Sequence, residues 1–132
     1  MPGVLVNQGK DLFAQAVVNQ VPPQDLRLKI FTNPTTPIVE HTEADYTEAT
    51  FQGYRDVVLP GVSWKPSGRG TLTFDPREFV SAADQPTQQA YGYYLVHAVS
   101  GQLVGAERFA SGPYPIGFKG DRLEVTPTVA IA

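Results

Sequence analysis

The chain has 132 residues, which is the size of a single domain. It contains no cysteine, and this excludes disulfide scaffolds, cysteine-ligated zinc, iron–sulfur clusters and thiol catalysis. Ten Lys and Arg against thirteen Asp and Glu give a net charge of −3, which disfavours nucleic-acid binding driven by phosphate neutralisation. Twelve Gly and twelve Pro interrupt short runs rich in aromatic and β-branched residues, so we expect a sandwich or barrel of short strands.

The N-terminal residues are not expected to act as a signal peptide. The first six residues have no basic group, and no stretch of the sequence approaches the roughly 20 apolar residues that span a bilayer. We therefore expect a soluble protein made in the cytoplasm, with no membrane partner. Val4, Leu5 and Val6 form an apolar run that is either part of an extended arm over residues 1–8 or the first strand of the domain.

Two segments follow before the first loop. Residues 13–19 are compatible with a strand or a helix, and Pro22-Pro23 ends either one. Residues 25–32 alternate between apolar and polar side chains, which predicts a half-buried strand. The apolar side of this strand carries Leu26, Leu28 and Ile30.

Short runs separated by proline and glycine continue to the C-terminus. Residues 42–51 have room for one helical turn. The remaining segments predicted to be strands are 54–59, 62–65, 71–74, 77–80 and 121–126, the last continuing into 128–131. Pro127 cannot donate a ladder hydrogen bond, so it is predicted to lie at a bulge or on a sheet edge.

A hairpin is predicted over residues 90–110. Ser100-Gly101 between two β-rich runs favours a two-residue connection, with Val99 opposite Gln102. In this register Tyr93 lies opposite Arg108, and the ring of Phe109 covers Gly92. Both faces are apolar near the turn, so we expect the hairpin at the centre of a sheet rather than at an edge.

The order of aromatic and glycine motifs resembles that of a known group of proteins. The motifs are Phe51-Gln52-Gly53-Tyr54, Trp64, Tyr91-Gly92-Tyr93-Tyr94-Leu95-Val96, Gly101-Gln102-Leu103-Val104, Ala106-Glu107-Arg108-Phe109, Gly112-Pro113-Tyr114 and Val125-Thr126-Pro127. Together with a Val-Leu-Val-Asn start at residues 4–7, they resemble small all-β structural proteins of tailed bacteriophages. The resemblance implies a capsid decoration, or cement, protein with a jelly-roll-like fold, which braces adjoining capsomers.

We therefore predict an all-β protein, a single antiparallel β-sandwich, jelly-roll-like, with seven or eight strands over residues 1–132. We expect no enzyme activity and no cofactor. The expected partners are the major capsid protein and further copies of this chain, on the capsid surface of the virion after synthesis in the host cytoplasm. The alternatives are a phage tail or fibre component and a carbohydrate-binding β-sandwich module. The strand faces predicted to be buried include Leu28, Ile30, Phe74, Leu95, Val96, Val104, Phe109 and Val125.

Several residues have the chemistry of catalytic or metal sites. For each of them a role in the structure of the protein is favoured over a role in catalysis or metal binding. His97 lies in the predicted hairpin, where a core or interface histidine satisfied by one hydrogen bond is favoured over a catalytic base. His41, Glu43 and Asp45 have the spacing of metal ligands on one strand face, but a solvated acidic loop is favoured. Carboxylate pairs that could act as acid and base, Glu43 with Asp45 and Asp75 with Glu78, are interpreted as surface charge.

Aromatic residues supply the candidate binding surface. Tyr54, Trp64, Tyr114 and Phe118 could form a sugar-binding platform or anchor a protein partner, and core packing is favoured for the first two. Tyr114 lies between two prolines in a predicted loop, so it is the better surface candidate. The partner-interface candidates are Val4, Leu5, Val6, Tyr114 and Phe118.

Overall fold

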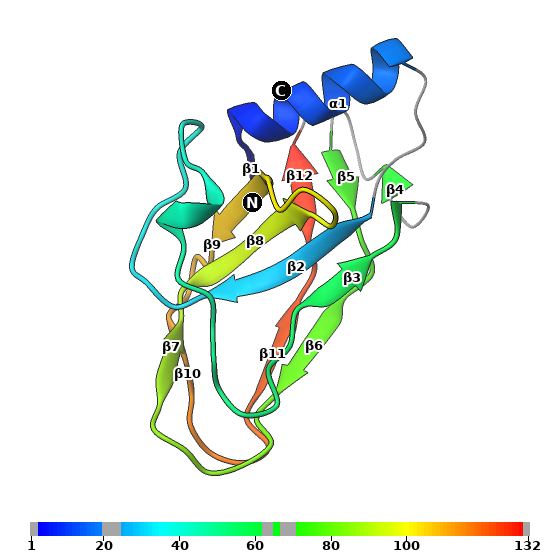
Figure 1. The fold of residues 1–132 in the computed structure, drawn as a ribbon. Coiled ribbons are helices and arrows are strands. Elements are labelled where there is room, and N and C mark those ends of the chain that lie inside the picture. The colour runs from blue at the N-terminus through cyan, green and yellow to red at the C-terminus, as the bar shows by residue number, and fades with distance from the viewer. Residues whose placement is uncertain (1–2, 20–24, 62–64, 67–70, 131–132) are drawn as a thin grey trace.

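The structure is a computed structural model that describes residues 3–19, 25–61, 65–66 and 71–130 (Figure 1). Apart from Lys65, the strand predicted over 62–65 lies outside these residues, and Trp64 with it. The described elements are β1 (Val4–Leu5), α1 (Asn7–Asn19), β2 (Leu26–Phe31), the 3-10 turn η1 (Glu43–Asp45), β3 (Val57–Leu59), β4 (Lys65–Pro66), β5 (Thr71–Thr73), β6 (Arg77–Val80), β7 (Gln88–Ala90), β8 (Gly92–His97), β9 (Leu103–Arg108), β10 (Tyr114–Ile116), β11 (Arg122–Val125) and β12 (Thr128–Ala130).

The strands form one larger and three smaller antiparallel sheets. The five-stranded sheet has the order β1-β9-β8-β2-β3, and the others are β10-β7, β11-β6 and β12-β5-β4. A parallel bridge between Gly3 and Val129 joins the edge of the first sheet to β12. The predicted antiparallel all-β fold is confirmed, and its arrangement is sandwich-like (Figure 1).

Two clusters of buried side chains lie on opposite faces of the five-stranded sheet. Leu26, Leu28 and Ile30 on β2 are buried in the larger cluster, as their alternation predicted, while Phe31 belongs to the smaller one. The larger cluster fills the space between the sheets and includes Leu95, Phe74, Val104, Val125 and Phe79. Of the residues predicted to be buried, Phe109 differs, because it is only partly buried at the margin of this cluster.

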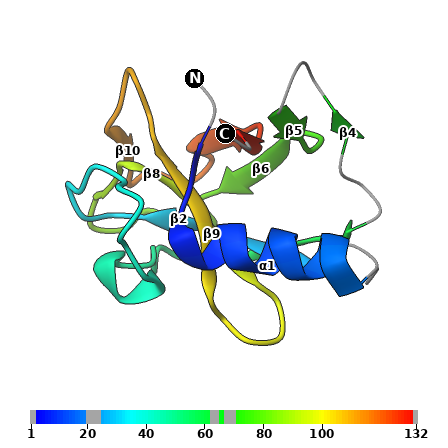
Figure 2. The ribbon, with the colours of Figure 1, turned by 90° about the horizontal axis from the view of Figure 1, so that it is seen from above.

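A helix packs against β9, and a long loop covers the second face of the sheet. Residues 13–19, which were compatible with either element, belong to α1, which starts at Asn7 and packs across β9 (Figure 2). The loop after β2 contains η1, the helical turn predicted for this region. It brings Tyr46 onto the sheet, where its ring stacks on Tyr94 at a centroid distance of 5.1 Å. Covering both faces explains why β8 and β9 are apolar on both sides.

The predicted hairpin is present as β8 and β9 and lies centrally in the sheet, but its predicted register was wrong by one residue from Gly92 to Leu95. An irregularity after Leu95 makes it wrong by two at Val96, which pairs with Leu103. Gly92 pairs with Arg108, and Tyr93 with Glu107. The N–H of His97 donates to the carbonyl of Gln102 at 2.8 Å, so residues 98–101 form the connection in place of a two-residue turn. His97 Nδ1 accepts the N–H of Ser100 at 3.1 Å, and these hydrogen bonds favour the longer loop.

The close contact at Gly92 is made by a different ring from the one predicted. A Cβ at Gly92 would collide with the ring of Phe31, which lies opposite it on β2, and with the carbonyl of Glu107. Phe109 was predicted to cover this glycine, but the shift in register moves it away from that position.

Prolines divide the C-terminal strands more finely than expected. The run over 121–131 splits at Pro127 into β11, which pairs with β6, and β12, which pairs with β5. Asp75-Pro76 makes a matching break between β5 and β6. The strand predicted from residue 54 starts only at Val57. The described residues therefore form twelve shorter strands where seven or eight longer ones were expected.

Candidate functional site

The N-terminal interface candidates lie within the domain. Val4 and Leu5 pair with Ala106 and Gly105 of β9, so they form the first strand of the sheet. Leu5 is 5% exposed and Val6 is fully buried, while Val4 remains partly exposed. Of the two alternatives, an extended arm or the first strand of the domain, residues 4–5 therefore follow the second. The side chains of Leu5 and Val6 pack inside the protein.

The two histidines make local contacts with neighbouring side chains. His97 Nδ1 lies 3.0 Å from the Ser100 hydroxyl in the exposed β8–β9 loop. His41 Nδ1 lies 2.9 Å from the Tyr46 hydroxyl. Both contacts close short loops.

The acidic residues near His41 and in the β6 region serve local structure. Asp45 accepts the N–H of Thr42 at 2.8 Å and so caps η1. Glu78 forms an ion pair with Arg122 across β6 and β11 at 2.7 Å. Among the described residues no three His, Asp or Glu side chains are close enough to hold a metal ion.

Tyr54 packs against the core in place of forming a surface platform. Its ring stacks on Phe79 at 5.7 Å, and its hydroxyl donates to Glu48 at 2.8 Å. Burial and the hydrogen bond to Glu48 raise the pKa of Tyr54. The core-packing interpretation of this residue is therefore the one that the structure supports.

Phe118 lies on the turn between β10 and β11 and is 73% exposed. Hydrogen bonds hold the backbone of this turn from two sides. Asp121 Oδ2 accepts the N–H groups of Gly117 at 2.9 Å and Phe118 at 2.8 Å, and these bonds lower the pKa of Asp121. Asp84 Oδ1 accepts the N–H of Lys119 at 2.8 Å. A large apolar side chain is thus presented to solvent on a fixed backbone.

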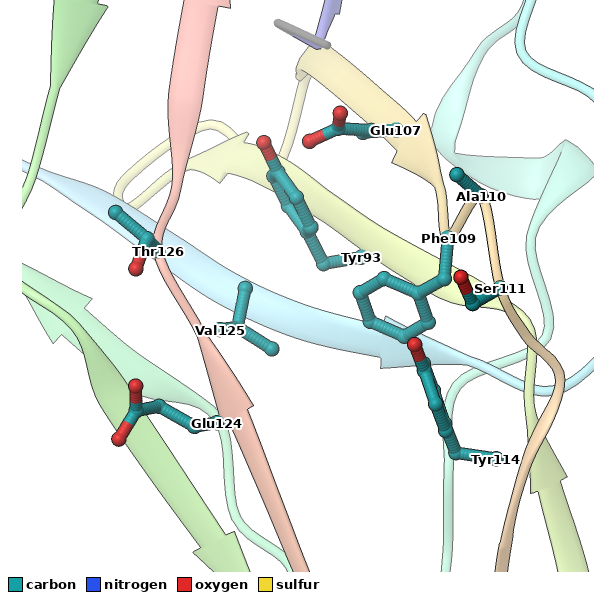
Figure 3. A pocket seen from close by; sticks show the side chains of 9 residues that line it. All are labelled: Tyr93, Glu107, Phe109, Ala110, Ser111, Tyr114, Glu124, Val125 and Thr126. Carbon is teal, nitrogen blue, oxygen red and sulfur yellow. The ribbon is translucent and has the colours of Figure 1, made fainter.

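A cavity of about 230 Å³ opens beside β9 and the loop that follows it (Figure 3). The segments that line it are far apart in the sequence, since they belong to β8, residues 107–114 and residues 124–126. Its walls carry three aromatic rings, two carboxylates and four small or hydroxyl-bearing side chains: Tyr93, Phe109, Tyr114, Glu107, Glu124, Ala110, Ser111, Val125 and Thr126. Of the predicted interface residues, only Tyr114 lines this cavity.

The two carboxylates of the cavity have different surroundings. Glu107 is partly buried and faces the Tyr93 hydroxyl, whereas Glu124 is exposed and points away from the aromatic rings (Figure 3). Burial raises the pKa of Glu107, and hydrogen bonding with Tyr93 acts in the opposite direction. Because the two carboxylates do not face each other, they lack the arrangement of an acid–base pair flanking a scissile bond.

No family model, no curated protein and no solved structure matches the chain. Within the described residues, no helix has the length and apolar character needed to cross a membrane.

Proposed function

We propose that this protein is a non-enzymatic structural protein of a tailed-phage virion, which attaches to the assembled capsid as a decoration protein. The proposal joins the resemblance of the aromatic and glycine motifs to one observation, the exposed Phe118 on a turn with a fixed backbone. The turn would form part of the surface that meets the major capsid protein. Further copies of the chain are expected to bind as an oligomer.

The physical argument for attachment to the capsid is that the apolar side chain of Phe118 is exposed and held in position before a partner binds. Full burial of a phenylalanine side chain is worth about 1.5–3 kcal/mol. The hydrogen bonds to Asp121 and Asp84 hold the turn before any partner arrives, so little backbone entropy is lost on attachment. Large aromatic side chains are also enriched in the buried centre of protein interfaces.

Copy number in the virion separates this proposal from its alternative. Quantitative mass spectrometry of purified virions should find hundreds of copies of the chain if it covers the shell. A handful of copies would instead support a tail or fibre component with the same mode of attachment. Absence from purified virions would contradict both assignments.

Attachment itself is testable by sedimentation with capsids that lack this protein. We expect Phe118→Ala to weaken co-sedimentation at least tenfold, because the variant removes about 2 kcal/mol of burial. The matched control is Val99→Ala in the β8–β9 loop, which is 87% exposed and lies at the opposite end of the molecule from the β10–β11 turn (Figure 1). Equal binding by wild type, Phe118→Ala and Val99→Ala would exclude this turn from the contact surface.

A further inference from the structure

The cavity beside β9 has a wall made of aromatic rings. The Phe109 ring lies 5.4 Å from that of Tyr114 at an interplanar angle of 59°, and 6.4 Å from that of Tyr93 at 44°. Rings tilted in this sequence form a curved apolar surface rather than a flat stack. Tyr114 is 39% exposed, so the wall is accessible to a ligand from solvent.

Polar groups face this wall from the other sides of the cavity. The Glu107 carboxylate lies at one end, and the hydroxyl-bearing residues Ser111 and Thr126 lie on either side (Figure 3). No Lys or Arg lines the cavity, and a partly buried carboxylate repels anions. A ligand that fits must therefore donate hydrogen bonds to the carboxylate while placing carbon–hydrogen groups against the aromatic rings.

A polyhydroxylated ring satisfies both requirements. Its hydroxyl groups donate charge-assisted hydrogen bonds to a carboxylate, and its apolar face packs on aromatic side chains. A cationic amine would also pair with the Glu107 carboxylate, so the experiment below includes an amine as the competing ligand. The size is also informative: about 230 Å³ is below the range of drug-sized pockets, which begins at ~300 Å³, and suits a single six-membered ring.

We propose that this cavity binds one neutral pyranose residue, either as a free sugar or as the terminal residue of a glycan. Glu107 accepts hydrogen bonds from the sugar hydroxyls, and Phe109 with Tyr114 packs against the face of the ring. This site is separate from the Phe118 turn and does not depend on attachment to a capsid.

Binding of simple glycosides to the full chain tests the proposal. Saturation-transfer NMR and calorimetry would be run with the methyl glycosides of glucose, galactose, mannose and N-acetylglucosamine. We expect at least one to bind with a dissociation constant on the order of 1 mM, a value typical of weak single-site recognition. An oligosaccharide ending in that sugar should bind more tightly if the natural source is a glycan, and equally if it is the free sugar.

Two variants and one control locate the binding. Glu107→Gln keeps the shape of the side chain and removes its charge, and Tyr114→Ala removes the exposed ring; each should weaken binding at least tenfold. Phe118→Ala should bind the sugar as the wild type does. If Glu107→Gln proves unstable in urea denaturation, Tyr114→Ala alone decides the question.

Three results would overturn the proposal: no neutral glycoside binding at concentrations of tens of millimolar, binding that both variants retain, or preferential binding of an amine such as lysine methyl ester. None of these results would contradict capsid attachment, because the capsid experiment depends on Phe118. In the same way, loss of capsid attachment without loss of sugar binding would contradict only the decoration role. Hydrolysis of a glycoside would contradict the non-enzymatic part of the proposed function.

Discussion

At the scale of single residues, Asp121 shows how one carboxylate can order a loop. Its Oδ2 atom accepts two backbone N–H groups, from Gly117 and Phe118, and these bonds favour the charged form. The pKa of Asp121 is therefore lowered from its ordinary value of 3.8. Since the folded pKa lies below the unfolded one, the stabilising effect is complete above pH 3.8 and is lost as the pH falls through the lowered pKa.

This linkage predicts an acid transition of the Phe118 turn. The amide resonances of Gly117 and Phe118 should titrate together in NMR spectra, with a midpoint below 3.8. Asp121→Asn keeps an acceptor oxygen but cannot ionise, so in this variant the same resonances should stay constant over that pH range. A midpoint at or above 3.8 in the wild type would show that these hydrogen bonds do not stabilise the carboxylate in solution.

The residues of the cavity show why sequence reasoning found only part of the candidate site. Tyr114 was identified because two prolines place it in a loop, and the structure puts it at the cavity. Glu107 was missed, because the predicted register set Tyr93 opposite Arg108. A slip of one residue moves a side chain to the other face of a sheet, so Glu107 was placed away from the face that Tyr93 occupies.

At the scale of elements, strand patterns were easier to predict than the elements that cover the sheet. The alternation in residues 25–32 identified β2 and its buried side correctly. Residues 13–19 fitted a helix or a strand, because the choice depends on how the whole of α1 packs against β9. Tertiary packing of this kind lies outside the local pattern. The break between residues 71–74 and 77–80 was predicted from Asp75-Pro76, whereas the division at Pro127 depends on which neighbour each half pairs with.

The contact between α1 and β9 leads to a prediction for Gly9. This glycine is buried, and a Cβ added to it would collide with the backbone carbonyl of Val104. Alanine at an exposed helical position stabilises by about 1 kcal/mol relative to glycine, whereas forced overpacking costs about 1–3 kcal/mol. A backbone carbonyl cannot change rotamer to relieve the collision, so we expect Gly9→Ala to reduce the free energy of unfolding by up to about 2 kcal/mol.

Urea denaturation provides the measurement for Gly9→Ala. Lys10→Ala, at the exposed neighbouring position of the same helix, is the matched control and should change the free energy of unfolding by less than about 0.5 kcal/mol. Stabilisation by Gly9→Ala would mean that α1 does not approach β9 this closely in solution.

At the scale of the whole molecule, folding removes phenol groups from water on both faces of the five-stranded sheet. Tyr46 and Tyr94 belong to the smaller cluster, and Tyr93 and Tyr54 pack with the larger one. Burial is the first cause of a raised pKa at all four tyrosines. At Tyr46 burial, reinforced by the charge of Asp45, raises the pKa to about 12.

These shifts predict that stability falls steeply in alkaline solution. Above pH 10, the ordinary tyrosine pKa, the unfolded chain releases protons that the folded protein retains. Each buried tyrosine then reduces the free energy of unfolding by about 1.4 kcal/mol per pH unit, so four give a slope of up to about 5.5 kcal/mol per pH unit. The free energy of unfolding falls until the pH reaches the pKa values that the tyrosines have in the folded protein. Below pH 10 the stability that the buried phenols contribute is fully present.

The tyrosine prediction can be separated from general alkaline damage by changing one phenol. Tyr94→Phe keeps the ring that stacks on Tyr46 and removes the group that ionises. Urea denaturation above pH 10 should therefore give a slope smaller by about 1.4 kcal/mol per pH unit in this variant. If the two slopes are equal, the Tyr94 phenol has the same pKa in the folded and unfolded states, and the packing of the loop containing Tyr46 over this face of the sheet does not exclude water from it.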